Sequence, residues 1–202
     1  MKKKVYIILS IVLLIIGFIY LMIKLGKQSA MYEYQKDLIT VPDFLKNHYP
    51  INSDLYSFAN LNISYPFIDE NREAVVYRLT CSKVSEENIN KELAKIEMNK
   101  IASYKSSDSH LLLINKMDTI LDNDSVYYPI PYFNLNDKKY PSNNKSGLDD
   151  NFNIYILECQ ISENFKNNRK ELLPKDWPRN GYSKGVCINE KERIIIYWFV
   201  VW

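Results

Sequence analysis

Histidine, cysteine and glycine are scarce in this 202-residue chain, which contains two, three and five of them. His48 and His110 are far apart, and no cysteine has a histidine or another cysteine within five positions. Zinc sites and cysteine–histidine dyads are usually recognised by short ligand spacings or by recurring histidines. The sequence therefore predicts no metal site, and it contains no motif that indicates a cofactor.

With three cysteines, the chain can form at most one disulfide and one leftover thiol. Cys81, Cys159 and Cys187 each lie in a stretch with the alternating pattern of a strand. Two interpretations remain open. Either all three are free and packed as small hydrophobic side chains, or Cys159 and Cys187 form a bridge between neighbouring strands in an oxidising compartment.

The chain also lacks an excess of charge of either sign, since 26 basic residues are opposed by 24 acidic ones. Five of the lysines flank the first hydrophobic segment: Lys2, Lys3, Lys4, Lys24 and Lys27. Without them, residues 28–202 contain 21 basic and 24 acidic residues, a net charge of −3. A nucleic-acid-binding domain needs a basic surface, so we expect no nucleic-acid partner.

A long hydrophobic run does occur, because residues 5–23 contain no charged side chain. At about 1.5 Å per residue, a helix of this length spans about 28 Å, close to the roughly 30 Å of a hydrocarbon core. A cleaved signal peptide would have a shorter apolar region and a small-x-small cleavage motif. More positive charge precedes the run than follows it, which predicts a cytoplasmic N-terminus.

We therefore expect four parts in this chain. They are a cytoplasmic tail (1–4), an uncleaved transmembrane anchor (5–23), a juxtamembrane helical segment (24–50) and an extracytoplasmic domain (51–202), periplasmic or on the cell surface.

The domain mixes strand and helix patterns. Residues 73–81 alternate like a strand, and Ser85 is placed to cap an amphipathic helix that reaches about Tyr104. Residues 152–161 alternate again, with Tyr155 and Cys159 on one face and Ile154 and Glu158 on the other. Two strands, 182–188 and 193–202, follow and form a C-terminal hairpin. These patterns predict an α+β fold, in which a mostly antiparallel sheet is packed by one main amphipathic helix.

The last strand, residues 193–202, has no polar face. Such a strand is usually central in its sheet and covered on both sides, here by the helix and by loops or the juxtamembrane segment. The alternative is an exposed apolar face that a partner covers. Arg78 and Glu158, on the two other strong strands, are expected to form a structural salt bridge across the sheet.

Two catalytic motifs occur by chance. Residues 181–185 match G-x-S-x-G, but a hairpin strand rather than a helix follows, and no histidine lies downstream as an α/β-hydrolase requires. Residues 142–145 match S-x-x-K within an asparagine-rich segment that does not resemble the start of a buried helix. The sequence therefore predicts no catalytic residues.

A binding surface is suggested by aromatic and basic residues in two proline-rich segments, 127–140 and 173–182. Tryptophan, tyrosine and arginine dominate binding hot spots, although the same side chains can instead close one end of the sheet. The candidate binding residues are Trp177, Arg179, Tyr182, Lys184, Tyr132 and Phe133.

The function that these patterns favour is a single-pass, membrane-anchored envelope protein whose domain binds a protein partner and is not an enzyme. One alternative is a small envelope hydrolase that acts on cell-wall polymer or peptide. It would be favoured by a cleft that places Glu158 near Asp149 or Asp150. The other alternative is a module that binds a glycan or small ligand through the aromatic residues.

Overall fold

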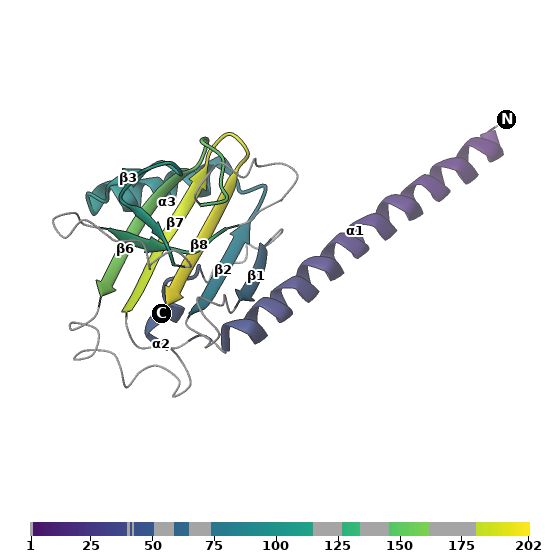
Figure 1. Cartoon of the computed structure of the whole chain (residues 1–202). Helices are drawn as coiled ribbons and strands as arrows, with labels where there is room; N and C mark the ends of the chain where they lie inside the picture. The colour runs from purple at the N-terminus through teal and green to yellow at the C-terminus, as the bar shows by residue number, and fades with distance from the viewer. Residues whose placement is uncertain are drawn as a thin grey trace.

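The computed structural model describes residues 2–39, 41, 43–50, 59–64, 74–114, 127–133, 146–161 and 181–202. They form a long N-terminal helix and an α+β domain with a mostly antiparallel sheet (Figure 1), which confirms the expected class. The elements are α1 (Lys2–Ile39), α2 (Asp43–Lys46), β1 (Ala59–Ser64), β2 (Val75–Cys81), α3 (Glu86–Met98), β3 (Ser103–Tyr104), β4 (Leu111–Leu113), β5 (Tyr128–Ile130), β6 (Asn153–Ile161), β7 (Gly181–Asn189) and β8 (Ile194–Val201).

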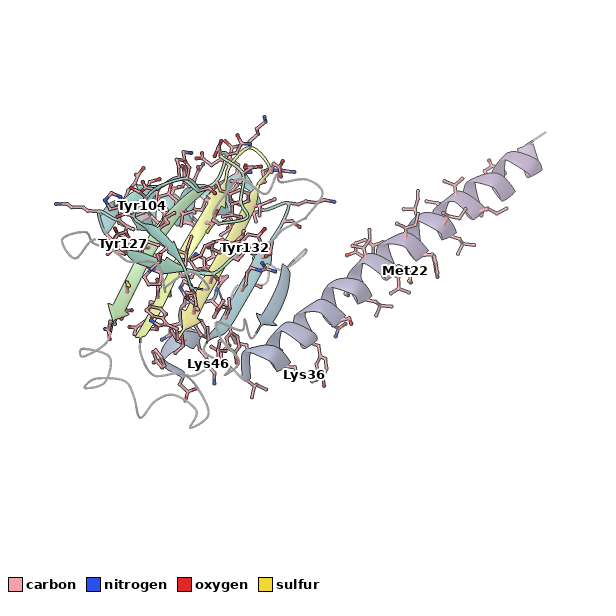
Figure 2. The ribbon with its side chains drawn as sticks, in the orientation of Figure 1. Met22, Lys36, Lys46, Tyr104, Tyr127 and Tyr132 are labelled. Carbon is pink, nitrogen blue, oxygen red and sulfur yellow. The ribbon has the colours of Figure 1, made fainter. Side chains whose placement is uncertain are left out.

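Helix α1 is continuous from the expected anchor into the expected juxtamembrane segment. It projects away from the domain, and only its C-terminal end comes near the sheet (Figure 1). Large apolar side chains between Ile11 and Leu25 are exposed around the helix (Figure 2). Among the residues described, no helix is found that has both the length and the apolar character needed to cross a membrane.

The main sheet has the strand order β1-β2-β8-β7-β6-β3, and every neighbouring pair in it is antiparallel. Strand β8 lies between β2 and β7, with Tyr197 opposite Leu79 on one side and opposite Val186 on the other. Every residue from Ile195 to Trp202 is buried. The prediction of a central last strand is therefore confirmed.

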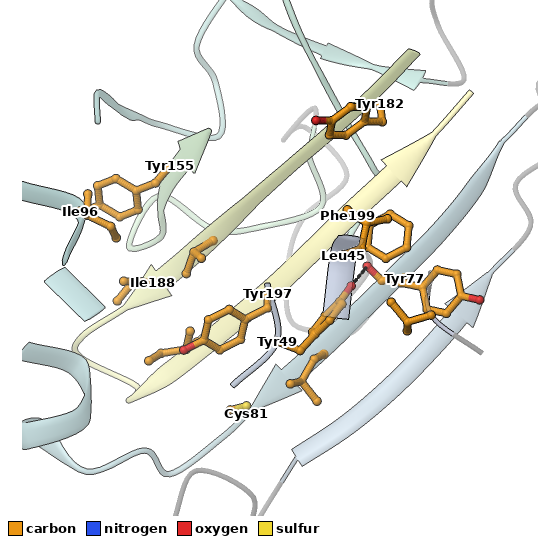
Figure 3. Close-up of a cluster of buried hydrophobic side chains, with 14 of the residues drawn as sticks. Leu45, Tyr49, Tyr77, Cys81, Ile96, Tyr155, Tyr182, Ile188, Tyr197 and Phe199 are labelled. Carbon is orange, nitrogen blue, oxygen red and sulfur yellow. Dashed lines mark hydrogen bonds between the residues drawn. The ribbon is translucent and has the colours of Figure 1, made fainter. Parts of the chain in front are cut away.

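One face of the sheet, which we call the helical face, packs against α2, α3 and the end of α1 (Figure 3). Tyr77 and Phe199 stack there with their ring centroids 4.7 Å apart. The hydroxyl of Tyr49 donates a hydrogen bond to the backbone oxygen of Tyr77 at 3.4 Å. The segment after α1 thus fills a core position instead of serving only as a connection.

The other face, which we call the loop face, is covered by the short parallel pair of β4 and β5 and by irregular segments. Trp198 is its largest fully buried side chain, and the ring of Phe133 meets it edge-on at 5.8 Å. Ile130, Leu148 and Phe152 are also fully buried. Each face of β8 therefore has its own hydrophobic cluster.

Helix α3 begins as expected but is shorter than expected. The Ser85 side chain accepts a hydrogen bond from the backbone nitrogen of Asn88, as an N-cap does. The helix ends at Met98, before the expected Tyr104, because Asn99 caps it and Lys100 has a φ of 53°. A left-handed residue cannot continue a right-handed helix, and the chain then enters β3.

Strand β6 departs from strict alternation at Leu157, where a β-bulge shifts its register against β7. The extra residue brings Glu158 opposite Lys184, on the helical face with Tyr155. We expected Glu158 to share a face with Ile154, and that expectation was wrong, since a bulge exchanges the two faces for all residues beyond it.

The expected pair of Arg78 and Glu158 is also absent. Arg78 lies on β2 and donates to the backbone oxygen of Phe133 on the loop face. Glu158 faces the opposite side of the sheet, and β8 and β7 separate the two strands. Each charged group instead pairs with a group on its own face of the sheet.

Candidate functional site

A pocket of about 620 Å³ lies on the helical face, between α2, α3 and strands β6 to β8. Its apolar lining consists of Phe44, Ile96, Ile101, Leu157, Val186 and Tyr197. Its polar lining consists of Asn47, His48, Glu92, Lys95, Asn99, Glu158 and Lys184. Polar residues thus outnumber apolar ones in the lining, which makes this pocket more polar than the usual site for a small ligand.

The sheet contributes an ion pair to this pocket. The ammonium nitrogen of Lys184 lies 2.7 Å from Oε2 of Glu158. The other carboxylate oxygen accepts hydrogen bonds from the Tyr182 hydroxyl and, at 3.3 Å, from Nε2 of Gln160. With three donors around it, the Glu158 carboxylate is held in one orientation, and the bulge at Leu157 makes this possible.

Helix α3 contributes a second ion pair on the opposite wall, where Lys95 lies 2.5 Å from Oε1 of Glu92. The side chain of Glu92 is mostly buried, whereas that of Lys95 is mostly exposed. The two walls therefore each present one positive and one negative group. Their charges balance, so the pocket does not select for a strongly charged ligand by net charge.

His48, two residues after the end of α2, lies next to the ring of Tyr197 with centroids 6.0 Å apart. Its Nε2 is 2.9 Å from the backbone oxygen of Trp198. Because that oxygen can only accept, Nε2 carries the proton of the neutral ring. Burial first, and the nearby Lys184 second, lower the pKa of His48 from 6.5 to about 4. A general base works best when its pKa is near the working pH, so His48 is better suited to hydrogen bonding than to proton transfer at neutral pH.

The predicted binding residues do not gather in one place. Lys184 lines the pocket, and Tyr182 is fully buried and helps to hold Glu158. Tyr132 is 49% exposed, but its neighbour Phe133 is fully buried against Trp198 on the loop face. The interpretation of Phe133 and Tyr182 as surface residues was therefore wrong. Trp177 and Arg179 lie outside the described residues.

Sequence reasoning missed the pocket because its walls come from separate elements. His48, Phe44 and Glu92 are distant in sequence from Glu158. Asp149 and Asp150, which we considered as neighbours of Glu158, do not line the pocket. The amphipathic pattern of α3 identified the apolar side of this helix, but not the charged groups at its border.

Of the two interpretations of the cysteines, the bridge between Cys159 and Cys187 is wrong, because all three cysteines are free. Cys159 is opposite Ser183 and Cys187 is opposite Ile154. The two cysteines are thus offset by four residues along β7, which is about 13 Å in a strand. A disulfide requires Cα atoms within about 7 Å. Burial raises the pKa of Cys159 to about 11 and that of Cys81 to about 12.

No family model, curated protein or solved structure matches this chain. The case for a function therefore depends on the pocket and on the long helix.

The lowered pKa of His48 predicts that the free energy of unfolding decreases as the pH falls. Between about pH 6.5 and pH 4 the unfolded chain binds a proton at His48 that the folded chain does not, so stability rises with pH in this window. We expect the free energy of unfolding to fall by about 2 kcal/mol between pH 7 and pH 4.5 through His48, allowing for its partial exposure.

Urea unfolding of the wild type and of His48→Gln, at both pH values, measures this effect. Glutamine keeps an amide donor but cannot gain charge, and all other titrating groups are common to both proteins. The wild type should therefore lose more stability than the variant on acidification. Equal losses in the two proteins would contradict the prediction.

Proposed function

We propose that this chain is a single-pass membrane protein of the envelope, whose extracytoplasmic domain binds a protein partner at the pocket. The observation that carries the proposal is the pocket itself, whose lining combines apolar side chains with two internally paired sets of charges. Protein interfaces commonly combine an apolar core with a polar rim. The N-terminus is proposed to be cytoplasmic, and no nucleic acid is proposed as a partner.

Three features support the membrane anchor. Residues 5–23 of the sequence carry no charge, the apolar side chains from Ile11 to Leu25 are exposed, and α1 projects away from the domain. An isolated soluble helix with such a surface would leave a large apolar area in water, which soluble proteins avoid. Residues 5–9 extend the uncharged run on the N-terminal side of these exposed side chains.

A second candidate, an envelope hydrolase, is favoured by one observation: the carboxylates of Glu92 and Glu158 line the same pocket. Against it, each carboxylate is already engaged by a lysine, and His48 is neutral at working pH. We therefore place binding first. If the protein degrades cell-wall polymer or peptide and Glu158→Gln abolishes this activity, hydrolysis replaces binding as the proposed function.

Photo-crosslinking in native membranes tests the binding proposal. A photoreactive amino acid is placed in the full-length chain either at Asn47, an exposed residue of the pocket lining, or at Tyr132, an exposed residue of the loop face. We expect a discrete crosslinked protein from position 47 and none from position 132. Absence of adducts from position 47, or the same adducts from both positions, would contradict the proposal.

The same membranes test the anchor and its orientation. Protease added outside intact cells should remove the domain and leave a fragment containing residues 5–23 in the membrane pellet. Release of the intact chain by alkaline washing, or protection of the domain until the cells are lysed, would contradict a single-pass anchor with the domain outside.

A further inference from the structure

Helix α1 carries an exposed stripe of regularly spaced residues beyond the hydrophobic run. The stripe, which we call the seam, consists of Leu25, Gln28, Tyr32, Gln35 and Ile39. Its spacing alternates between three and four residues, the heptad pattern of helices that supercoil around one another. Leu25, Tyr32 and Ile39 are each more than half exposed. The seam is therefore accessible along about 21 Å of the helix.

Neither lipid nor the domain accounts for the seam. Tyr32 and Ile39 lie about 14 and 24 Å beyond the end of the proposed anchor, at 1.5 Å per helical residue. Helix α1 projects away from the domain (Figure 1), and near its end Leu38 packs against the core while Ile39 is exposed. Large apolar side chains that recur along one side of a solvated helix are typical of contact with a second helix.

The charges of α1 indicate which helix fits. Five of the 16 residues from 24 to 39 are charged, and none of the five belongs to the seam. In a parallel pair of identical helices, each seam residue meets its counterpart in the other copy, and like charges at such a position would repel each other. A seam without charge is therefore suited to a second copy of this chain.

The two glutamines of the seam also favour an identical partner. A glutamine amide both donates and accepts hydrogen bonds, so Gln28 and Gln35 can each pair with their counterparts in the other copy. A polar residue at a seam position fixes the register of paired helices. Two copies anchored in one membrane have the same orientation, which makes their helices parallel. The same spacing continues into the hydrophobic run at Phe18 and Ile11.

We propose that two copies of this chain associate in parallel along α1, in a left-handed coiled coil whose contact surface is the seam. The assembly then presents two domains and two pockets on one paired stalk. This inference goes beyond the proposed function, since it takes only the direction of the helix from the proposed anchor and does not involve the pocket.

Disulfide crosslinking of the full-length chain in native membranes tests the contact. A cysteine replaces Leu25, Tyr32 or, as the matched control, Gly26, where an added Cβ has no atom within 4 Å. At 3.6 residues per turn, position 26 is about 100° from position 25 and about 160° from position 28 around the helix. A disulfide requires Cα atoms within about 7 Å. The wild type, with its three native cysteines, measures the background.

We expect Leu25→Cys and Tyr32→Cys to give, on oxidation, a covalent product with twice the mass of the chain. Gly26→Cys should remain at the wild-type background. Equal crosslinking at positions 25 and 26 would overturn the seam as the contact surface. A product of any other mass from positions 25 and 32 would place a different protein on the seam and overturn the second copy.

Sedimentation equilibrium of the full-length protein in detergent measures the strength of the association. Tyr32→Lys places two like charges opposite each other in the seam, whereas Gly26→Lys adds the same charge on the other side of the helix. We expect the dissociation constant of the dimer to rise about tenfold or more in Tyr32→Lys and to change less than about twofold in Gly26→Lys. A monomeric wild type, or a dimer that both variants leave unchanged, would overturn the proposal. The crosslink from position 47 tests the pocket separately, so loss of the dimer leaves the proposed function standing.

Discussion

Replacing Trp198 with alanine should lower the free energy of unfolding by about 3–5 kcal/mol, the range for removing a large aromatic side chain from a packed core. Trp198 is fully buried at the centre of the loop face and packs edge-on against Phe133. The cluster around it comes from several irregular segments as well as from the sheet. Because the structure around a core cavity usually relaxes only in part, most of this loss should remain in the variant.

The full-length protein is unfolded with urea in detergent, and unfolding is monitored by far-UV circular dichroism, because this signal reports on the backbone and does not require tryptophan. Tyr132→Ala is the matched control, because Tyr132 is next to Phe133 in sequence but half of its surface is exposed. The control should change stability by roughly 0.5 kcal/mol or less. A similar small loss in both variants would show that the loop face does not depend on Trp198.

Adding a single methyl group at position 185 should lower the free energy of unfolding by nearly as much. A Cβ added to Gly185 would lie 2.3 Å from the backbone oxygen of Tyr155 and 2.7 Å from Cζ2 of Trp198. The Trp198 ring can shift a little, but the oxygen belongs to the neighbouring strand and can move only if β6 and β7 separate. We expect Gly185→Ala to cost about 3 kcal/mol, at the upper end of the usual range for overpacking.

Gly17→Ala is the matched control for this substitution. A Cβ at Gly17 has no atom within 4 Å, and alanine favours a helix over glycine by up to about 1 kcal/mol. Stability of the control should therefore be unchanged or higher. If Gly185→Ala unfolds at the same urea concentration as the wild type, the close approach of β6 and β7 at this point is wrong.

The two core positions should also be coupled. Gly185 and Trp198 are opposite each other in the pairing of β7 and β8, and residues in contact commonly show coupling of about 0.5–3 kcal/mol. In the double variant, alanine at position 198 frees part of the space that the added Cβ needs. The combined loss should therefore be smaller than the sum of the two single losses.

The sequence predicted the elements of the domain well where a local pattern determines them. The alternation in residues 75–81 and 153–161 and the cap at Ser85 correspond to β2, β6 and α3. The apolar last strand was correctly placed inside the sheet. Such patterns can be recognised because, in a half-buried helix or strand, buried and exposed side chains recur with the period of that backbone conformation.

The candidate site was much less predictable. A bulge has no reliable signal in a single sequence, yet the bulge at Leu157 decides that Glu158 meets Lys184 instead of sharing a face with Ile154. Glu158 is separated from Arg78 by this change of face and also by the two strands that lie between β6 and β2. Phe133 was misplaced for a related reason, because an aromatic residue in a loop can cover a core or face the solvent, and only its neighbours decide.

The sequence by itself determined the hydrophobic run of residues 5–23, the α+β class and the central place of the last strand, since each depends on composition or on a periodic pattern along one segment. Only the tertiary structure decided that His48, Glu92, Glu158 and Lys184 share a pocket and that the cysteines remain apart. These features depend on the register between strands and on which helix covers which face. Those are relations between distant segments, and the pattern within one segment does not determine them.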